Sequence, residues 1–98
     1  MYSDNPVVLQ ILSLLKQYNI SRVVVSPGSR HFSLIHSMEA DKWFKLYSVV
    51  DERSAAFFAI GLIQKTGRPV AIACTSGTAC MNYSSAVIEA YYQHLPLL

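Results

Sequence analysis

Three short segments of the sequence combine turn residues with side chains that could bind an anion or move a proton. Ser29 and Arg30 follow the apolar run VVVSPG, Asp51 and Glu52 follow a second valine pair, and the triplet SGT at 76–78 follows a third apolar run. An arginine next to the start of a helix can bind a carboxylate or a phosphate, because the guanidinium donates two parallel hydrogen bonds and the helix presents free N–H groups. Ser29 and Arg30 therefore predict an anion site; taken alone, they are also compatible with a capped turn that carries a solvated charge.

Glu52 is the candidate for proton transfer. Its neighbours in VVDERSAAFFAIG are mostly apolar and small, and such surroundings suit a carboxyl group to acid–base work. Acids in the first turn of a helix also stabilise it through the helix dipole, which is the better interpretation of Asp51. Ser76, Gly77 and Thr78 could bind a phosphate, although a capped helix start accounts for them as well.

An alternation of helices and strands positions these segments. Asn5 and Pro6 are typical of a helix start, and Asn19 is a plausible stop. Further helices are predicted over about 30–39, over 52–66 and from 78 onward, and strands over 22–26, 44–50 and 69–75. Apolar side chains recur at helical spacing in the first and last helices: Val7, Val8, Ile11, Leu14, Leu15 and Tyr18, and Ala79, Tyr83, Ala86, Val87, Ala90 and Tyr91.

The order of these elements predicts the fold class. Strands that are apolar throughout and are joined by helices are typical of an α/β protein with a parallel sheet in a three-layer αβα arrangement. The polar segments then lie together at the carboxyl ends of the strands, where open α/β sheets bind their ligands. The final QHLPLL predicts the beginning of a fourth strand, so we expect a piece of a longer protein that is truncated within that strand.

Composition narrows the function classes. The 98 residues are 52% hydrophobic and 14% charged, which excludes a disordered chain and suggests that some apolar surface faces another chain or domain. The eight basic residues are scattered, so nucleic-acid binding is not expected. No apolar run could span a membrane and the N-terminus lacks a signal-peptide pattern, which predicts a cytosolic protein. Cys74 and Cys80 fit neither a disulfide framework nor a zinc site and are expected to be buried free thiols.

Together the segments are more specific than each is alone. VSPGSR, VDERSAAFFAIGLIQKTGRPVAIACTSGTA and NYSSAVIEAYY, in this order, resemble the family of thiamine-diphosphate-dependent synthases that add decarboxylated 2-oxoglutarate to isochorismate in menaquinone biosynthesis. The resemblance covers nearly the whole chain and is strongest over 23–92. It implies that 1–98 is the N-terminal part of a pyrimidine-binding domain, with the rest of the enzyme outside this chain.

The resemblance also implies roles for the candidate residues. Glu52 matches the glutamate that hydrogen-bonds N1′ of the aminopyrimidine and promotes deprotonation of the thiazolium carbon. Ser29 and Arg30 match residues that face the substrate carboxylates, and the turn of Ser76, Gly77 and Thr78 matches the one beside the pyrimidine ring. Family members commonly continue SPGSR with Ser-Thr-Pro, whereas this chain has HFS at 31–33, which implies a different start of the next helix.

Further parts of the site are implied to lie elsewhere. The family holds the diphosphate and Mg²⁺ on a separate domain and shares the active site between two subunits of a homodimer or homotetramer, so this chain is expected to bind no metal and to be inactive alone. The implied substrates are 2-oxoglutarate and isochorismate. Two alternatives remain: another thiamine-dependent decarboxylase or carboligase, and a flavodoxin-like binding module without catalysis.

Overall fold

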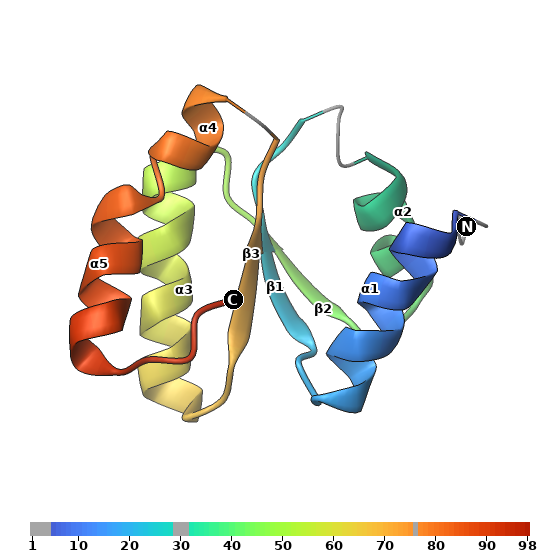
Figure 1. Cartoon of the computed structure of the whole chain (residues 1–98), viewed down its shortest axis with the longest axis horizontal. Coiled ribbons are helices and arrows are strands. Elements are labelled where there is room, and N and C mark those ends of the chain that lie inside the picture. Colours follow the sequence, from blue (N-terminus) through green and yellow to red (C-terminus); the bar gives the residue numbers. More distant parts are fainter. Residues whose placement is uncertain (1–4, 29–31, 76) are drawn as a thin grey trace.

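A computed structural model describes residues 5–28, 32–75 and 77–98 and has a parallel sheet between two layers of helices (Figure 1). This confirms the three-layer αβα prediction. The elements, in chain order, are α1 (Pro6–Gln17), β1 (Arg22–Val25), α2 (Phe32–Ala40), β2 (Lys45–Ser48), α3 (Glu52–Thr66), β3 (Val70–Ala73), α4 (Thr78–Met81) and α5 (Ser84–Gln93).

The strands lie in the order β2-β1-β3, and both pairs are parallel. Val25, the last residue of β1, is the register partner of both Ser48 and Ala73, so the three strands end level with one another. Their carboxyl ends form the upper edge of the sheet in Figure 1. The loops that lead into α2, α3 and α4 all begin at this edge.

A segment at the end of the chain adds to the other side of β3. The N–H of Leu98 donates to the carbonyl of Val70 at 3.0 Å, and the N–H of Ile72 donates to the carbonyl of Leu98 at 3.0 Å. A parallel bridge joins Val70 to Leu97. The residues of the predicted fourth strand therefore pair with β3, but through an isolated bridge and not as a strand of the sheet.

Alternating residues of β1 divide the core into two. Val23 and Val25 contribute to the side covered by α1 and α2, whereas Val24 packs with Ala55 and Ala59 of α3. All three valines are buried, as expected for a central parallel strand. The small side chains on α3 allow that helix to lie close against the sheet.

Local capping explains where α3 begins and ends. The carboxylate of Asp51 accepts a hydrogen bond from the N–H of Ser54 at 2.9 Å, and the helix ends at Gly67, whose φ of 69° is left-handed. At the start of α1, the side chain of Asn5 accepts from the N–H of Val7 at 2.9 Å. Both caps were predicted.

The structure corrects the predicted last helix. It is two helices, because Asn82 and Tyr83 separate α4 from α5. At this break the Ser84 hydroxyl donates to the Met81 carbonyl, so a side chain satisfies a carbonyl that a continuous helix would use. The Thr78 carbonyl accepts from both the N–H and the side chain of Asn82. The predicted stripe is wrong in part: Tyr83, Ala86 and Ala90 are buried, while Val87 and Tyr91 are exposed.

The buried face of α1 is also narrower than the set of apolar residues that recur at helical spacing in its sequence. Only Val8, Leu12 and Leu15 of this helix are buried, and they follow the spacing i, i+4, i+7. Val7, Ile11, Leu14 and Tyr18, which recur at helical spacing in the sequence, are exposed.

Candidate functional site

Four polar side chains gather at the carboxyl ends of the strands, and we call them the polar cluster: Ser26, Glu52, Cys74 and Tyr83. Ser26 and Cys74 directly follow β1 and β3, whose last residues are register partners, and the N–H of Ser26 donates to the carbonyl of Ala73 at 2.9 Å. Glu52 is the first residue of α3, and its charge acts on both Cys74 and Tyr83. The cluster lies on the face of the sheet that α3 covers.

Ser26 fixes the turn from which Glu52 emerges. Its side chain is fully buried, and its hydroxyl donates to the carbonyl of Val49 at 2.9 Å. The N–H of Val49 donates in turn to the carbonyl of Val25 at 3.0 Å. Two hydrogen bonds thus tie the β2–α3 turn to the end of β1.

Glu52 faces the same side of α3 as two residues that contact Tyr83. Ala56 and Ile60 follow Glu52 at i+4 and i+8, so all three lie along one face of the helix. Ala56 and Ile60 are buried in a cluster that includes Tyr83. Glu52 itself is half-buried.

Tyr83 is buried, and its hydroxyl has no hydrogen-bond partner among the described residues. Burial raises the pKa of Tyr83, the neighbouring Cys74 thiol and the Glu52 charge raise it further, and Ser26 lowers it. The phenol therefore stays protonated, and a possible donor, throughout the physiological pH range.

Cys74 is half-buried and Cys80 is exposed, so the prediction of two buried thiols is wrong. The reason is that Cys80 belongs to the single-turn helix α4, in which no residue is buried. Both cysteines are free, as predicted. Burial raises the pKa of Cys74; Tyr83 lowers it, and Cys80 and Glu52 raise it.

The structure describes only some of the site residues that were predicted from the sequence. Ser29, Arg30 and Ser76 lie outside the described residues. Gly77 precedes α4 with a φ of 79°, and Thr78 is the exposed first residue of that helix. The positive φ at Gly77 gives a conformational reason for glycine at this turn.

Three members of the polar cluster were not singled out by sequence reasoning. Ser26 and Cys74 carried a signal, because each is the first polar residue after a buried strand at equivalent positions of the sheet. Tyr83 carried none: its ring meets Ala56 and Ile60 only through the packing of α5 on α3.

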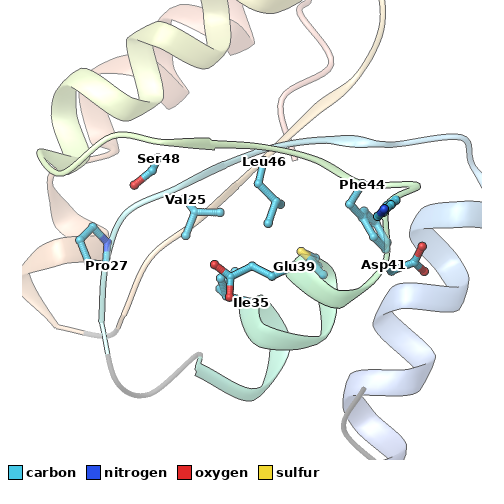
Figure 2. Close-up of a pocket in the computed structure, with 10 residues that line it drawn as sticks. Val25, Pro27, Ile35, Glu39, Asp41, Phe44, Leu46 and Ser48 are labelled. Atoms are coloured by element: carbon cyan, nitrogen blue, oxygen red, sulfur yellow. The ribbon is translucent and has the colours of Figure 1, made fainter. Parts of the chain in front are cut away.

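A pocket of about 660 Å³ lies on the opposite face of the sheet (Figure 2). Its walls come from the carboxyl ends of β1 and β2 and from α2 and the loop after it: Val25, Pro27, Ile35, Met38, Glu39, Asp41, Lys42, Phe44, Leu46 and Ser48. The charged residues on its walls are mixed in sign: Glu39 and Asp41, of which Asp41 is paired with Lys16, and Lys42. Because the pocket and the polar cluster lie on opposite faces of the sheet, the sheet separates them.

Within the ranges described, no group of three or more His, Cys, Asp or Glu side chains could hold a metal ion. In the same ranges, no helix is long and apolar enough to cross a membrane.

Comparison with known protein families identifies the family to which this chain belongs. The family described as "Thiamine pyrophosphate enzyme, N-terminal TPP binding domain" matches residues 7–98. The chain belongs to the thiamine pyrophosphate enzyme family. The matched range includes all four residues of the polar cluster.

Curated relatives within this family are similar over most or all of the chain. A 2-succinyl-5-enolpyruvyl-6-hydroxy-3-cyclohexene-1-carboxylate synthase of Bacteroides thetaiotaomicron is 48% identical over all 98 residues. The synthase of the same name from Geobacillus kaustophilus is 52% identical over 84 residues, or 86% of the chain. The chain spans 18% and 15% of the lengths of these two relatives.

A solved structure of the family has the same fold. Benzoylformate decarboxylase from Polynucleobacter necessarius superimposes with a TM-score of 0.80 and 26% identity. The likeness covers 99% of this chain and 17% of the decarboxylase.

Proposed function

We propose that this chain is the N-terminal part of the pyrimidine-binding domain of a thiamine-diphosphate-dependent carboligase. The complete enzyme would decarboxylate 2-oxoglutarate and add the resulting succinic semialdehyde unit to isochorismate in menaquinone biosynthesis. Support comes from the named synthases, which are 48% and 52% identical to the chain, against 26% for benzoylformate decarboxylase.

The observation that carries the proposal is the position of Glu52. Thiamine diphosphate, when bound, supplies a thiazolium carbon that acts as a nucleophile and electron sink once it is deprotonated. A half-buried carboxylate at the ligand-binding edge, with Ala55 and Ala56 buried behind it, suits the edge of an aminopyrimidine. The unpaired hydroxyl of Tyr83 leaves a further donor there. Glu52 would hold and release a proton at N1′ of the ring.

The diphosphate and Mg²⁺ are proposed to bind outside this chain. Support comes from the length of the relatives: the chain spans 18% of the Bacteroides thetaiotaomicron synthase, so most of such an enzyme lies outside it. Gly77 and Thr78, with Ser76, would instead line the pyrimidine ring, a role that fits the exposed turn at the start of α4.

Ser29 and Arg30 are proposed to bind substrate carboxylates. Pro27 and Gly28 lead from the buried end of β1 directly to them, so they follow the ligand-binding edge of the sheet. Both proposed substrates carry two carboxylates, and an arginine fork is suited to such groups. The pocket of Figure 2 is the weaker candidate, because its wall carries the two acids Glu39 and Asp41 beside Lys42.

A homodimer or homotetramer in the cytosol completes the proposal. Large apolar side chains on the outer side of α5 support an oligomer, since they would otherwise face water: Val87, Ile88, Tyr91 and Tyr92. Contact between subunits could bring Glu52 to a cofactor whose diphosphate the partner holds.

Replacing Glu52 tests the catalytic role in the full-length gene product. Glu52→Gln keeps the size of the side chain but cannot exchange the proton, so kcat should fall by about 10²–10⁴-fold. Hydrogen–deuterium exchange at the thiazolium carbon of bound cofactor should slow as well. Asp51→Asn is the matched control and should leave exchange unchanged. Wild-type exchange in Glu52→Gln would refute the assignment.

The alternative is another decarboxylase or carboligase of the family, as the likeness to benzoylformate decarboxylase allows. Consumption of 2-oxoglutarate only when isochorismate is present would favour the synthase, and turnover of other 2-oxo acids alone would favour the alternative. Arg30→Ala should lower kcat/KM for the substrates by about one to two decades, the loss of one charged hydrogen bond, with cofactor affinity little changed.

A further inference from the structure

Packing alone does not explain why residue 83 is a tyrosine with a buried hydroxyl group. The tyrosine is only 7% exposed, and its hydroxyl has no hydrogen-bond partner in the described ranges. A buried donor without an acceptor costs folding free energy, and phenylalanine would fill the same space without that cost. The buried residues that pack with it, Ala56, Ile60, Ala86 and Ala90, are apolar and offer the hydroxyl no side-chain acceptor.

The acceptors near this hydroxyl differ in strength. The hydroxyl hydrogen of Ser26 is already given to the carbonyl of Val49, which leaves Ser26 only lone pairs for Tyr83. The sulfur of Cys74 is a weak acceptor. The carboxylate of Glu52 is a strong one, its charge acts on Tyr83, and it stands on the helix face that packs against the tyrosine ring.

We propose that Tyr83 is a positioning residue for Glu52, whose hydroxyl donates a hydrogen bond to the carboxylate when the glutamate turns toward the sheet. One carboxylate oxygen is then fixed by Tyr83 and the other is free to meet the pyrimidine ring. A half-buried glutamate at the first position of a helix has several rotamers, and a charge-assisted hydrogen bond selects one of them. The inference rests on the proposed role of Glu52.

The reactivity of Cys74 can report on the proposed hydrogen bond between Tyr83 and Glu52 in the absence of cofactor. In a Cys80→Ser background of the full-length gene product, the rate of Cys74 alkylation by iodoacetamide is measured against pH. Glu52 and the Cys74 thiolate compete for the single hydroxyl hydrogen of Tyr83. Tyr83→Phe should slow alkylation, because hydrogen bonding from Tyr83 lowers the pKa of Cys74, and Glu52→Gln should accelerate it, because the Glu52 charge raises that pKa. The exposed Cys80 is removed because it would react as well and acts on Cys74.

The double variant then decides whether the two residues are coupled. If Tyr83 bonds to Glu52, the combined effect of Tyr83→Phe and Glu52→Gln on the alkylation rate should differ from the product of the single effects. A combined effect equal to that product would overturn the proposal. A second measurement uses a variant that retains Tyr83. In Glu52→Gln, the ¹³Cζ resonance of Tyr83 should shift and that of exposed Tyr91 should not. An unmoved Tyr83 resonance would also overturn it.

Exchange at the thiazolium carbon separates this inference from the proposed function. Tyr83→Phe should slow exchange roughly tenfold to a hundredfold, the loss expected for one charge-assisted hydrogen bond, with cofactor affinity little changed. Tyr18→Phe, at an exposed position just after α1, is the control and should match the wild type. Slow exchange in Glu52→Gln with normal exchange in Tyr83→Phe would refute the positioning role alone. Normal exchange in Glu52→Gln would refute the proposed function itself.

Discussion

Ser26 donates its hydroxyl hydrogen to the backbone carbonyl of Val49 across 2.9 Å, and this bond joins the buried end of β1 to the turn that leads into α3. Ser26 is fully buried, and the bond as a whole is part-buried. Glu52 lies three residues beyond Val49. The position of the proposed catalytic carboxylate therefore depends on a side chain from a different strand.

Ser26→Ala should destabilise the fold by about 1–3 kcal/mol, because it leaves the Val49 carbonyl without its side-chain donor in a buried setting. Urea unfolding measures the loss. Ser84→Ala is the control: its hydroxyl donates to the Met81 carbonyl at 2.7 Å, but the residue is exposed and water can replace the bond. Equal losses in the two variants would show that burial of Ser26 is not what matters.

Gly67→Ala should destabilise the protein by about 1–2 kcal/mol, because its φ of 69° is a left-handed conformation that costs free energy for an L residue with a side chain. Gly61→Ala should have the opposite sign and stabilise by about 0.5–1 kcal/mol, since this exposed glycine lies inside α3. A Cβ at either position would meet no described atom within 4 Å, so conformation alone separates them. Thermal unfolding of both variants measures the difference, and the same sign for both would contradict it.

Asp51→Asn should reduce the loss of the free energy of unfolding that occurs as the pH falls into the acid range. The backbone N–H of Ser54 lowers the pKa of Asp51 by hydrogen bonding to its carboxylate, and the Ser54 hydroxyl and Arg53 lower it further. A lowered folded-state pKa adds stability above the ordinary value of 3.8, and this stability is lost as the pH falls through the folded-state pKa. Asparagine keeps the cap without titrating.

Urea unfolding from about pH 5 down to about pH 2 should therefore show a smaller fall for Asp51→Asn than for the wild type. Glu89→Gln, an exposed acid on α5, serves as the control for a change of one charge. Parallel curves for wild type and Asp51→Asn would show that the Asp51–Ser54 bond does not survive in solution.

Cys80 should react with iodoacetamide faster than Cys74 in the folded protein. Cys80 is exposed, whereas Cys74 is half-buried and burial raises its pKa, which lowers the fraction of reactive thiolate at neutral pH. Peptide mass spectrometry after timed alkylation gives both rates. In urea the two rates should converge; a difference that persists there would come from local sequence and not from the fold.

Capping and turn residues made much of the backbone predictable. Asp51 and Gly67 bound α3 as expected, and Asn5 caps α1, because these interactions join residues that are close in the chain. Apolar runs predicted the parallel strands for a similar reason: a strand buried on both faces has no room for polar alternation. The family resemblance, which rests on ordered motifs, was confirmed by the match over 7–98.

The sequence by itself determined the order of elements, the parallel sheet, the family and the edge of the sheet at which Glu52 lies. Only the tertiary structure decided which apolar side chains are buried, because α1 and α5 carry them on more than one side and packing selects a single stripe. It also decided the neighbours of Glu52. Ser26, Cys74 and Tyr83 are distant from it in the chain, and only pairing of β1 with β3 and packing of α5 on α3 bring them to one place.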